Sequence, residues 1–427
     1  MTQLDQDRAN FESLAGDVAQ WSSTFQSQLK ERSVAAPSNG LPARALPVTG
    51  SGAKAAFEDF VTSIAPHLSG SAGPRYLGFV TGGATPASIM ADWLVAATDQ
   101  NVMVPGDSIA TEVELQALAW LRELFELPND FDGIITTGAT ASNILGALCA
   151  RQYVGERQNL DTAKSGLSGL EVEVFSATPH ASMQKAFGFI GLGRDAITRV
   201  PCLPDSEQMD VNALKEMLEN SDSAGKIVIA SAGTVTGTDF DNLKEIAELC
   251  ETHNAWLHVD AAFGLFTRLT ADKLHLTEGI ELADSITSDG HKWLNVPYDC
   301  GIFFTKHPAL LQQSCSVAAP YLDIGNSLPA FMDRGIENSR RFRALPVWMT
   351  LAAYGKQGYQ QLVEKNCELA SALAHWIEAS EGYELLTPCN LNIVVFRPKG
   401  LSDGEVKTLL NKINASGKLY LTPGAWQ

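Results

Sequence analysis

The sequence contains no paired cysteine motif. Its seven cysteines lie far apart, the number is odd, and no CxxC or CxxH spacing occurs. We therefore expect neither a disulfide framework nor a metal site, and a reducing cytoplasm fits this usage. No apolar run approaches the ~18 residues that span a bilayer. The first residues lack a basic stretch followed by an apolar core, so no secretory signal is expected.

Positive charge is also scarce. Lysine and arginine number 31 against 49 acidic residues, which gives a net charge of −18. Nucleic-acid binders normally carry a basic stripe, so we expect no nucleic-acid partner. The 427 residues are 45% hydrophobic and 19% charged, which is ordinary for a globular protein with one large domain and a smaller one.

β-prone runs alternate with helical patterns through the middle of the chain. This alternation predicts a mostly parallel sheet covered by helices on both faces, in an α/β fold. The expected strands are Gly133–Thr137, Val172–Ser176, Ile197–Val200, Ile227–Ala232, Trp256–Asp260, Ser285–Ser288 and Ile302–Thr305. The expected helices are 86–98, 109–126, 141–153, 182–189, 211–219 and 242–254.

The two ends of the chain differ from this middle part. Apolar residues recur every three or four positions over residues 1–35, which predicts an amphipathic helix, and 36–53 reads as a Pro- and Gly-rich linker. After Pro346 we expect helices at 347–379 and 403–415 with short β-prone runs at Asn392–Phe396 and Lys418–Leu421. We therefore divide the chain into an N-terminal arm and linker (1–75), a large domain (76–345) and a small α+β domain (346–427).

One lysine stands where a reactive amine is useful. Lys292 follows Gly290 and His291 at the end of a predicted strand. A lysine there can project into a cleft, lose solvent and act as a nucleophile. For any single lysine the plain alternative is an exposed loop residue.

A carboxylate ends the neighbouring apolar run, His258-Val259-Asp260-Ala261-Ala262. Ligands of open α/β sheets bind at the carboxyl ends of strands, and a buried Asp260 there can pair with a protonated ring nitrogen. An aspartate that caps the next turn is the alternative.

Small residues and hydroxyls open a helix after the first strand of the alternating region, in the segment Thr136–Asn143. Backbone N–H groups at such a helix start can bind a phosphate. An ordinary capped helix is the alternative. His180 and the segment Gly233–Gly237 follow two other strands, so an imidazole and further hydroxyls belong to the same edge.

This set of groups matches the needs of pyridoxal 5′-phosphate (PLP): a lysine for the aldehyde, an aspartate for the pyridinium nitrogen, a helix start for the phosphate and a flat side chain over the ring. His258–Ala262, followed about thirty residues later by His291-Lys292-Trp293, resembles the group II PLP-dependent amino-acid decarboxylases, which include aromatic-L-amino-acid and glutamate decarboxylases. The likeness begins near Pro74-Arg75-Tyr76 and includes Arg340–Arg343.

The resemblance implies a role for each matching residue. Lys292 would bond to the cofactor, Asp260 would pair with its ring nitrogen, Ala262 would pack on the ring, and His180 would stack over it. The other cofactor-binding positions would be Ala139, Thr140, Thr234, Asp289 and His291, and Thr81 would lie near the substrate. The implied fold is the aspartate-aminotransferase-like fold (PLP fold type I), in a homodimer with active sites at the subunit interface.

Three features depart from the family pattern. Asp289 stands where relatives often have asparagine, and a carboxylate near a phosphate is unfavourable unless it points away. Val235 stands where relatives often have a threonine, and Thr234 or Thr236 would take over the role of that threonine. The segment Asn326–Ser339 lacks the tyrosine that protonates the substrate carbon in relatives, although Tyr321 lies just before it.

We therefore expect PLP-dependent decarboxylation of an L-amino acid, with a lean toward aromatic substrates by analogy. Lys292 and His180 are the expected catalytic residues. Transamination, oxidative deamination or carbon–sulfur lysis on the same scaffold is the first alternative. An inactive cofactor-binding remnant is the second, since relatives continue beyond Gln427 and the small domain looks truncated. The Arg340, Arg341 and Arg343 cluster has two interpretations, a carboxylate or interface site and a structural set of salt bridges.

Overall fold

The structure is a computed structural model, and it describes residues 2–36, 40–41, 43–317 and 328–426. The chain divides into two compact units. The first comprises residues 1–83 and 400–423, and the second comprises residues 84–399 and 424–427. The three-part division predicted from the sequence stays a prediction. Among the described residues, no helix combines the length and the apolar character needed to cross a membrane.

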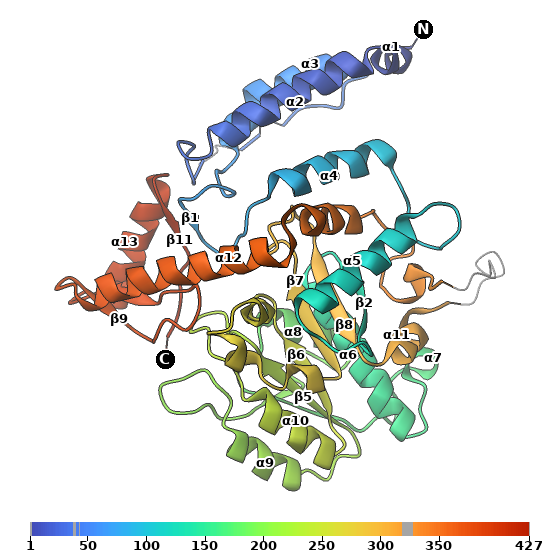
Figure 1. Cartoon of the computed structure of the whole chain (residues 1–427), viewed down its shortest axis with the longest axis vertical. Coiled ribbons are helices and arrows are strands. Elements are labelled where there is room, and N and C mark those ends of the chain that lie inside the picture. Colours follow the sequence, from blue (N-terminus) through green and yellow to red (C-terminus); the bar gives the residue numbers. More distant parts are fainter. Residues whose placement is uncertain (1, 37–39, 42, 318–327, 427) are drawn as a thin grey trace. The chain divides into compact units, whose positions relative to one another are not determined.

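The first unit is built from short helices and one small sheet (Figure 1). Asn10 leaves helical geometry, with ψ at 14°, so the helix expected over residues 1–35 is two helices. Arg75 ties the unit together, because its guanidinium donates to the carbonyls of Lys30, Arg32 and Lys418. The elements are α1 (Gln3–Ala9), α2 (Phe11–Ser27), α3 (Ala53–Asp59), α13 (Asp403–Ala415) and the parallel strands β1 (Tyr76–Leu77) and β11 (Tyr420–Leu421).

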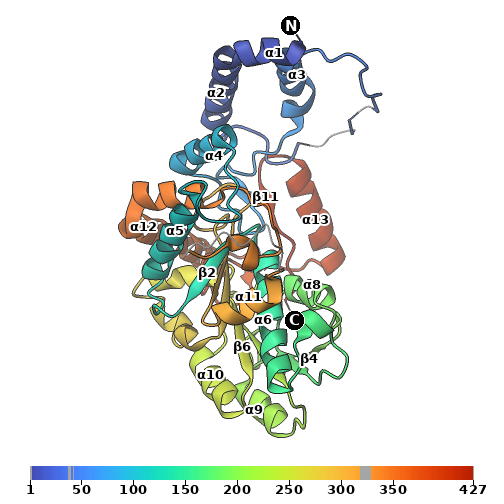
Figure 2. The same ribbon diagram turned by 90° about the vertical axis from the view of Figure 1, so that its right-hand side faces the viewer.

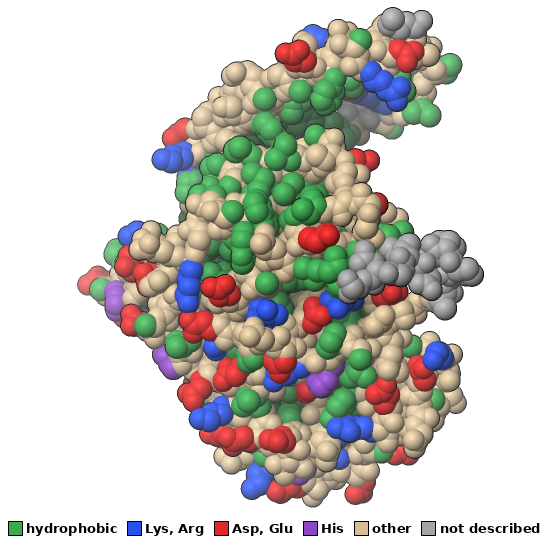
Figure 3. Space-filling model, turned by 45° about the vertical axis from the view of Figure 1, so that its right-hand side comes forward, with side chains coloured by type: hydrophobic (Ala, Val, Ile, Leu, Met, Phe, Trp, Pro, Cys, Tyr) green, Lys and Arg blue, Asp and Glu red, His purple; other side chains and the backbone are tan. Residues whose placement is uncertain are grey.

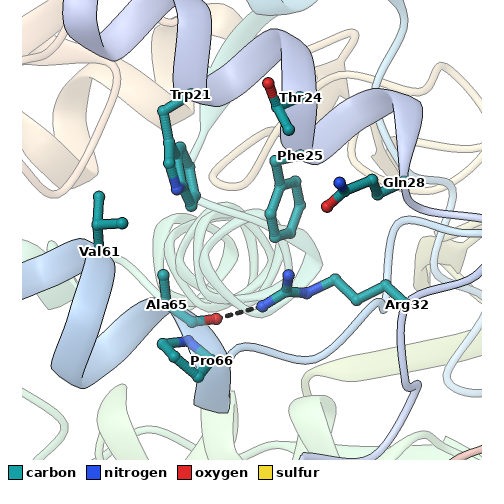
Figure 4. A pocket seen from close by; sticks show the side chains of 8 residues that line it. All are labelled: Trp21, Thr24, Phe25, Gln28, Arg32, Val61, Ala65 and Pro66. Carbon is teal, nitrogen blue, oxygen red and sulfur yellow. Dashed lines mark hydrogen bonds between the residues drawn. The ribbon is translucent and has the colours of Figure 1, made fainter.

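A small cavity of about 170 Å³ lies within this unit. Figure 4 shows Trp21 and Phe25 of α2 on one side of it and Val61 and Ala65 on the other. Arg32 donates to the backbone carbonyl of Ala65, which links the end of the α2 segment to the segment after α3. The cavity is therefore lined mainly by aromatic and aliphatic side chains.

The second unit contains a seven-stranded sheet in the order β2-β8-β7-β6-β5-β3-β4. Only β8 is antiparallel to its neighbours. All seven predicted strands are confirmed, and the inner strands are buried on both faces, whereas the edge strand β4 is partly exposed. Their bounds are β2 (Asp132–Thr136), β3 (Glu173–Ser176), β4 (Ile197–Arg199), β5 (Lys226–Ser231), β6 (Trp256–Asp260), β7 (Ser285–Asp289) and β8 (Gly301–Thr305).

Helices cover both faces of this sheet (Figures 1 and 2). The connections β2–β3 and β3–β4 run in one direction along the sheet and β4–β5 and β5–β6 in the other, so right-handed crossovers place their helices on opposite faces. The first two carry α6 (Ala139–Arg157), α7 (Thr162–Ser165) and α8 (Ala181–Phe189), and the others carry α9 (Val211–Glu219) and α10 (Leu243–Thr252). The helix α11 (Pro308–Cys315) packs against α6.

The remaining elements of this unit pack around a long helix. α12 (Ala344–Glu378) contacts α4 (Pro86–Thr98) and α5 (Ala110–Leu124), and its φ of 59° at Gly355 marks a kink. The β-prone run at Asn392–Phe396 forms a strand only from Phe396, where β10 (Phe396–Pro398) pairs with β9 (Tyr383–Leu385). The large-domain fold class predicted from the sequence is confirmed.

Candidate active site

The predicted site residues gather at the carboxyl ends of the parallel strands. Asp260 is the last residue of β6 and Asp289 is the last residue of β7. The two strands pair in parallel, with Asp260 opposite Thr287. The helix α6 begins directly after β2 at the same edge. Parallel strands therefore bring together residues more than 100 positions apart in the sequence.

Lys292 lies beside a carboxylate and an aromatic ring. Its Nζ is 3.3 Å from Asp289 Oδ2 and 5.3 Å from the centre of the Phe263 ring. The lysine side chain is only 19% exposed. An ion pair and a cation–π contact therefore hold the amine in a partly buried position rather than in an open loop.

The predicted phosphate site is a helix start that holds a carboxylate. Gly138, with φ at 148°, precedes α6, and the Ala139 N–H donates to Asp289 Oδ1 at 2.6 Å. Asp289 therefore points toward the predicted phosphate site. Compatibility with a phosphate had required this carboxylate to point away. His291 Nε2 lies 3.6 Å from Asp289 Oδ2, and burial lowers the pKa of His291 although Asp289 opposes that effect. Thr140, the second residue of α6, is half-buried.

Asp260 is buried and held by neutral donors. Asn143 Nδ2 donates to Asp260 Oδ2 at 2.9 Å, and the Ala262 N–H donates to Oδ1 at 3.2 Å. Ala262 itself is half-buried next to this carboxylate. Both oxygens therefore accept from uncharged groups.

His180 caps the start of α8. Its Nδ1 accepts the Ser182 N–H at 3.2 Å and lies 2.7 Å from Ser182 Oγ, while the residue as a whole is exposed. One edge of the imidazole is therefore fixed by the helix start. Its other edge remains available to a ligand.

Three other predicted positions are less directly connected to this group. The Thr234 hydroxyl donates to Glu207 and accepts the Asp239 N–H, so it is engaged within its own loop. Thr81 belongs to the first unit, between β1 and α4, and its role stays a prediction. Tyr321 lies outside the described residues.

A buried polar network behind Asp260 was not predicted. His258 Nε2 is 3.0 Å from Asn143 Oδ1, and His258 Nδ1 is 2.7 Å from Ser285 Oγ. Burial lowers the pKa of His258 to about 4, against a smaller opposing effect of Asp260. Asn143 and His258 stand inside the motifs that drew attention to the site, but nothing in the sequence indicated that they contact each other.

The arginine cluster consists of paired residues. Arg340 and Glu114 form an ion pair of 2.8 Å in which both side chains are 0% exposed. Arg341 pairs with Asp92 at 2.7 Å, and Arg343 pairs with Asp299 at 2.8 Å. This geometry favours the structural interpretation of the cluster.

Apart from Asp289, whose carboxylate competes with a phosphate at the start of α6, the residues present fit PLP. The Asp289 oxygen on the Ala139 N–H demonstrates that an anionic oxygen fits the start of α6. His291 Nδ1 and Thr287 Oγ1 are buried and have no hydrogen-bond partner among the described residues, so both atoms could bond to a ligand. Lys292 supplies an amine, and Asp260 supplies a charged acceptor on a neighbouring strand.

Known proteins resemble this chain closely enough to interpret the site. The family model of the pyridoxal-dependent decarboxylase conserved domain matches residues 38–399. An aromatic-L-amino-acid decarboxylase of Bacillus atrophaeus is 29% identical over 79% of this chain and 71% of its own length. An L-2,4-diaminobutyrate decarboxylase of Acinetobacter baumannii is 31% identical over 73% of this chain and 65% of its own length. The structure of Oryza sativa TDC with PLP and tryptamine has a TM-score of 0.90 and 21% identity, covering 98% of this chain and 91% of that one.

Proposed function

The chain belongs to the pyridoxal-dependent decarboxylase family, and we propose that it removes the α-carboxylate of an aromatic L-amino acid, with Lys292 and Asp260 as the principal cofactor residues. PLP is the cofactor, and the protein is a carboxy-lyase that acts on an amino acid. The observation that carries the residue assignment is the placement of Lys292, Asp260 and the start of α6 at one edge of the sheet.

Each side chain has a defined task in this proposal. The Lys292 amine binds the cofactor aldehyde, and Asp260 keeps a proton on the ring nitrogen. When bound, PLP supplies a ring that accepts the electrons of the bond to the departing carboxylate. His180 and Ala262 would hold the ring.

The remaining cofactor contacts surround the phosphate. Ala139, Thr140 and His291 hold it at the start of α6, with Asp289 close by. Thr234 is a further proposed cofactor contact. The aromatic preference is supported by relatives named aromatic-L-amino-acid decarboxylase at 29 to 31% identity.

The deciding experiment is a substrate panel assayed for both products. The full chain with PLP is incubated with L-tyrosine, L-tryptophan, L-phenylalanine, L-glutamate and L-2,4-diaminobutyrate, and CO2 and amine are quantified. We expect equal amounts of CO2 and amine from an aromatic substrate. Keto acid or aldehyde in place of amine would indicate another reaction on the scaffold, and PLP binding without turnover of any substrate would indicate an inactive remnant.

The proposed assembly is a homodimer in the cytoplasm. The α4 helix packs on α12 through Ala91 and Val95, yet Met90, Trp93 and Leu94 on its other side are 44 to 58% exposed. A broad group of hydrophobic side chains is visible on the face drawn in Figure 3. Apolar side chains exposed along one side of a helix favour a further contact, and a second copy of the chain would cover that side. The described cysteines are all free, which supports a reducing compartment.

A further inference from the structure

Asn143 connects two side chains that are expected to contact the cofactor, Asp260 and His180. It lies near the start of α6 and is 0% exposed. Its Nδ2 donates to Asp260 Oδ2 and to Ser182 Oγ, both at 2.9 Å. Its Oδ1 lies 3.0 Å from His258 Nε2. All polar atoms of this amide are therefore committed, and none of the contacts is with solvent.

The charge of Asp260 decides how the amide is oriented. A carboxylate only accepts hydrogen bonds, so the NH2 group of Asn143 must face it and Oδ1 must face His258. His258 Nε2 then carries the proton, and His258 Nδ1 accepts from the Ser285 hydroxyl at 2.7 Å. A flipped amide would set two acceptors against each other in a buried place, which is costly.

The same orientation supports one of the two donors to His180 Nδ1. The second N–H of Asn143 is donated to Ser182 Oγ, so the Ser182 O–H is free to donate to His180 Nδ1 at 2.7 Å. The Ser182 backbone N–H also donates to this nitrogen. Nδ1 is therefore an acceptor twice over, and the proton of the neutral imidazole resides on Nε2.

We propose that Asn143 is a positioning residue that links Asp260 to His180 through the Ser182 hydroxyl and, together with the Ser182 backbone N–H, supports the Nε2–H tautomer of His180, so that Nε2 is a hydrogen-bond donor in the active site. This inference rests on the proposed roles of Asp260 and His180 in binding PLP. One side chain thereby supports both the orientation of the carboxylate for the ring nitrogen and the donor character of the imidazole.

The test uses nitrogen NMR of the full chain, with its histidines isotopically labelled, in the presence and absence of PLP. Replacement of His180 by glutamine assigns the His180 signals among the eight histidines. We expect an unprotonated Nδ1 and a protonated Nε2 in the unaltered chain. Ser182→Ala removes the O–H donor but keeps the backbone N–H donor, so the Nδ1 signal should shift with the loss of one of its two hydrogen bonds while Nε2 keeps its proton.

Ser285→Ala is the matched control. It deletes a buried hydroxyl at the far side of His258 but leaves every contact of Asn143 in place. Its His180 signals and PLP affinity should be unchanged. Asn143→Ala should shift the His180 signals as Ser182→Ala does and should also weaken PLP binding about 10-fold, the usual scale for a hydrogen bond to a charged group.

The double variant Asn143→Ala/Ser182→Ala shows whether the contacts of Asn143, Ser182 and His180 depend on one another. Ser182→Ala should add nothing to the His180 shift once Asn143 is alanine, since the relay is already broken. Unchanged His180 signals in Ser182→Ala, or independent and additive shifts, would overturn the proposal. Failure of the unaltered protein to bind PLP would refute the proposed function. The spectra recorded without PLP test the link from Asn143 to His180 separately.

Discussion

Among single residues, Lys292 has the most direct chemical consequence. Lys292→Ala should abolish the visible absorbance of the lysine-bound cofactor and reduce decarboxylation on the order of 10³-fold or more, because the amine that bonds to the aldehyde is gone. Absorbance spectra and CO2 release provide the measurements. Lys306, which lies 5.1 Å from the Phe131 ring, offers a matched control, and Lys306→Ala should retain the spectrum. An unchanged spectrum in Lys292→Ala would refute the assignment.

Asp289 presents a negative charge where the cofactor phosphate is expected. Its oxygen already occupies the Ala139 N–H at 2.6 Å, so the phosphate meets both a competitor and a like charge. Asp289→Asn should tighten the binding of pyridoxine 5′-phosphate about 10-fold, or about 1.4 kcal/mol. Titration calorimetry measures this without any bond to Lys292. Pyridoxine, which lacks the phosphate, is the control ligand, and an equal gain for both ligands would contradict the electrostatic explanation.

His258 should make stability depend on pH. Its pKa falls to about 4 in the folded protein, against about 6.5 in the unfolded chain. Between these values the unfolded chain binds more protons, so stability is lost as pH falls from about 6.5 to about 4, by about 3 kcal/mol in total. Chemical denaturation at several pH values should show a shallower loss in His258→Gln. His275→Gln, at an exposed position, is the control and should lose stability with falling pH as the unaltered protein does. The same pH dependence in His258→Gln as in the unaltered protein would contradict the prediction.

At the scale of elements, the packing of α6 on the sheet depends on one glycine. A Cβ at Gly146 would lie 2.5 Å from Nδ1 and Cε1 of the buried His258 ring. Gly146→Ala should therefore destabilise the protein by about 1–3 kcal/mol, measured as the free energy of unfolding. Gly16, in the interior of α2, has no atom within 4 Å of the position that a Cβ would occupy, so Gly16→Ala should stabilise by about 0.5–1 kcal/mol. Similar losses in both variants would show that the His258 contact is not the cause.

Most elements of the sheet could be predicted because their signal is local. β6 and β7 are uninterrupted β-prone runs, and their observed bounds differ from the predicted ones by at most one residue. Breaks within the terminal regions were harder to locate. The helix interruption at Asn10 and the late start of β10 at Phe396 depend on tertiary packing rather than on periodicity.

The site was predictable in its residue types but not in its connections. Lys292, Asp260 and His180 stood out because each follows a strand at an edge where ligands bind. The relay through Asn143 joins a helix to side chains 39 and 117 positions away, and a serine or asparagine in isolation carries no such signal. The proximity of Asp289 to the Ala139 N–H likewise depends on how β7 meets α6.

At the scale of the whole molecule, the apolar side of α4 is where a dimer can be tested. Trp93 is 44% exposed and lies between the exposed Met90 and Leu94. An arginine at this position is tolerated on a solvent-exposed surface but is unfavourable when a subunit interface buries it. Trp93→Arg should convert a dimer to monomers, or weaken it at least about 100-fold, in sedimentation velocity runs over a range of protein concentrations.

The control for this substitution is a second exposed tryptophan. Trp376 on α12 is 60% exposed, and Trp376→Arg makes the same chemical change outside α4. If α4 forms the interface, Trp376→Arg should sediment as the unaltered protein does, while Trp93→Arg should sediment more slowly as it is diluted. Circular dichroism and the free energy of unfolding of each variant separate dissociation from misfolding. A dimer that survives Trp93→Arg at the lowest concentrations would place the subunit contact on another surface.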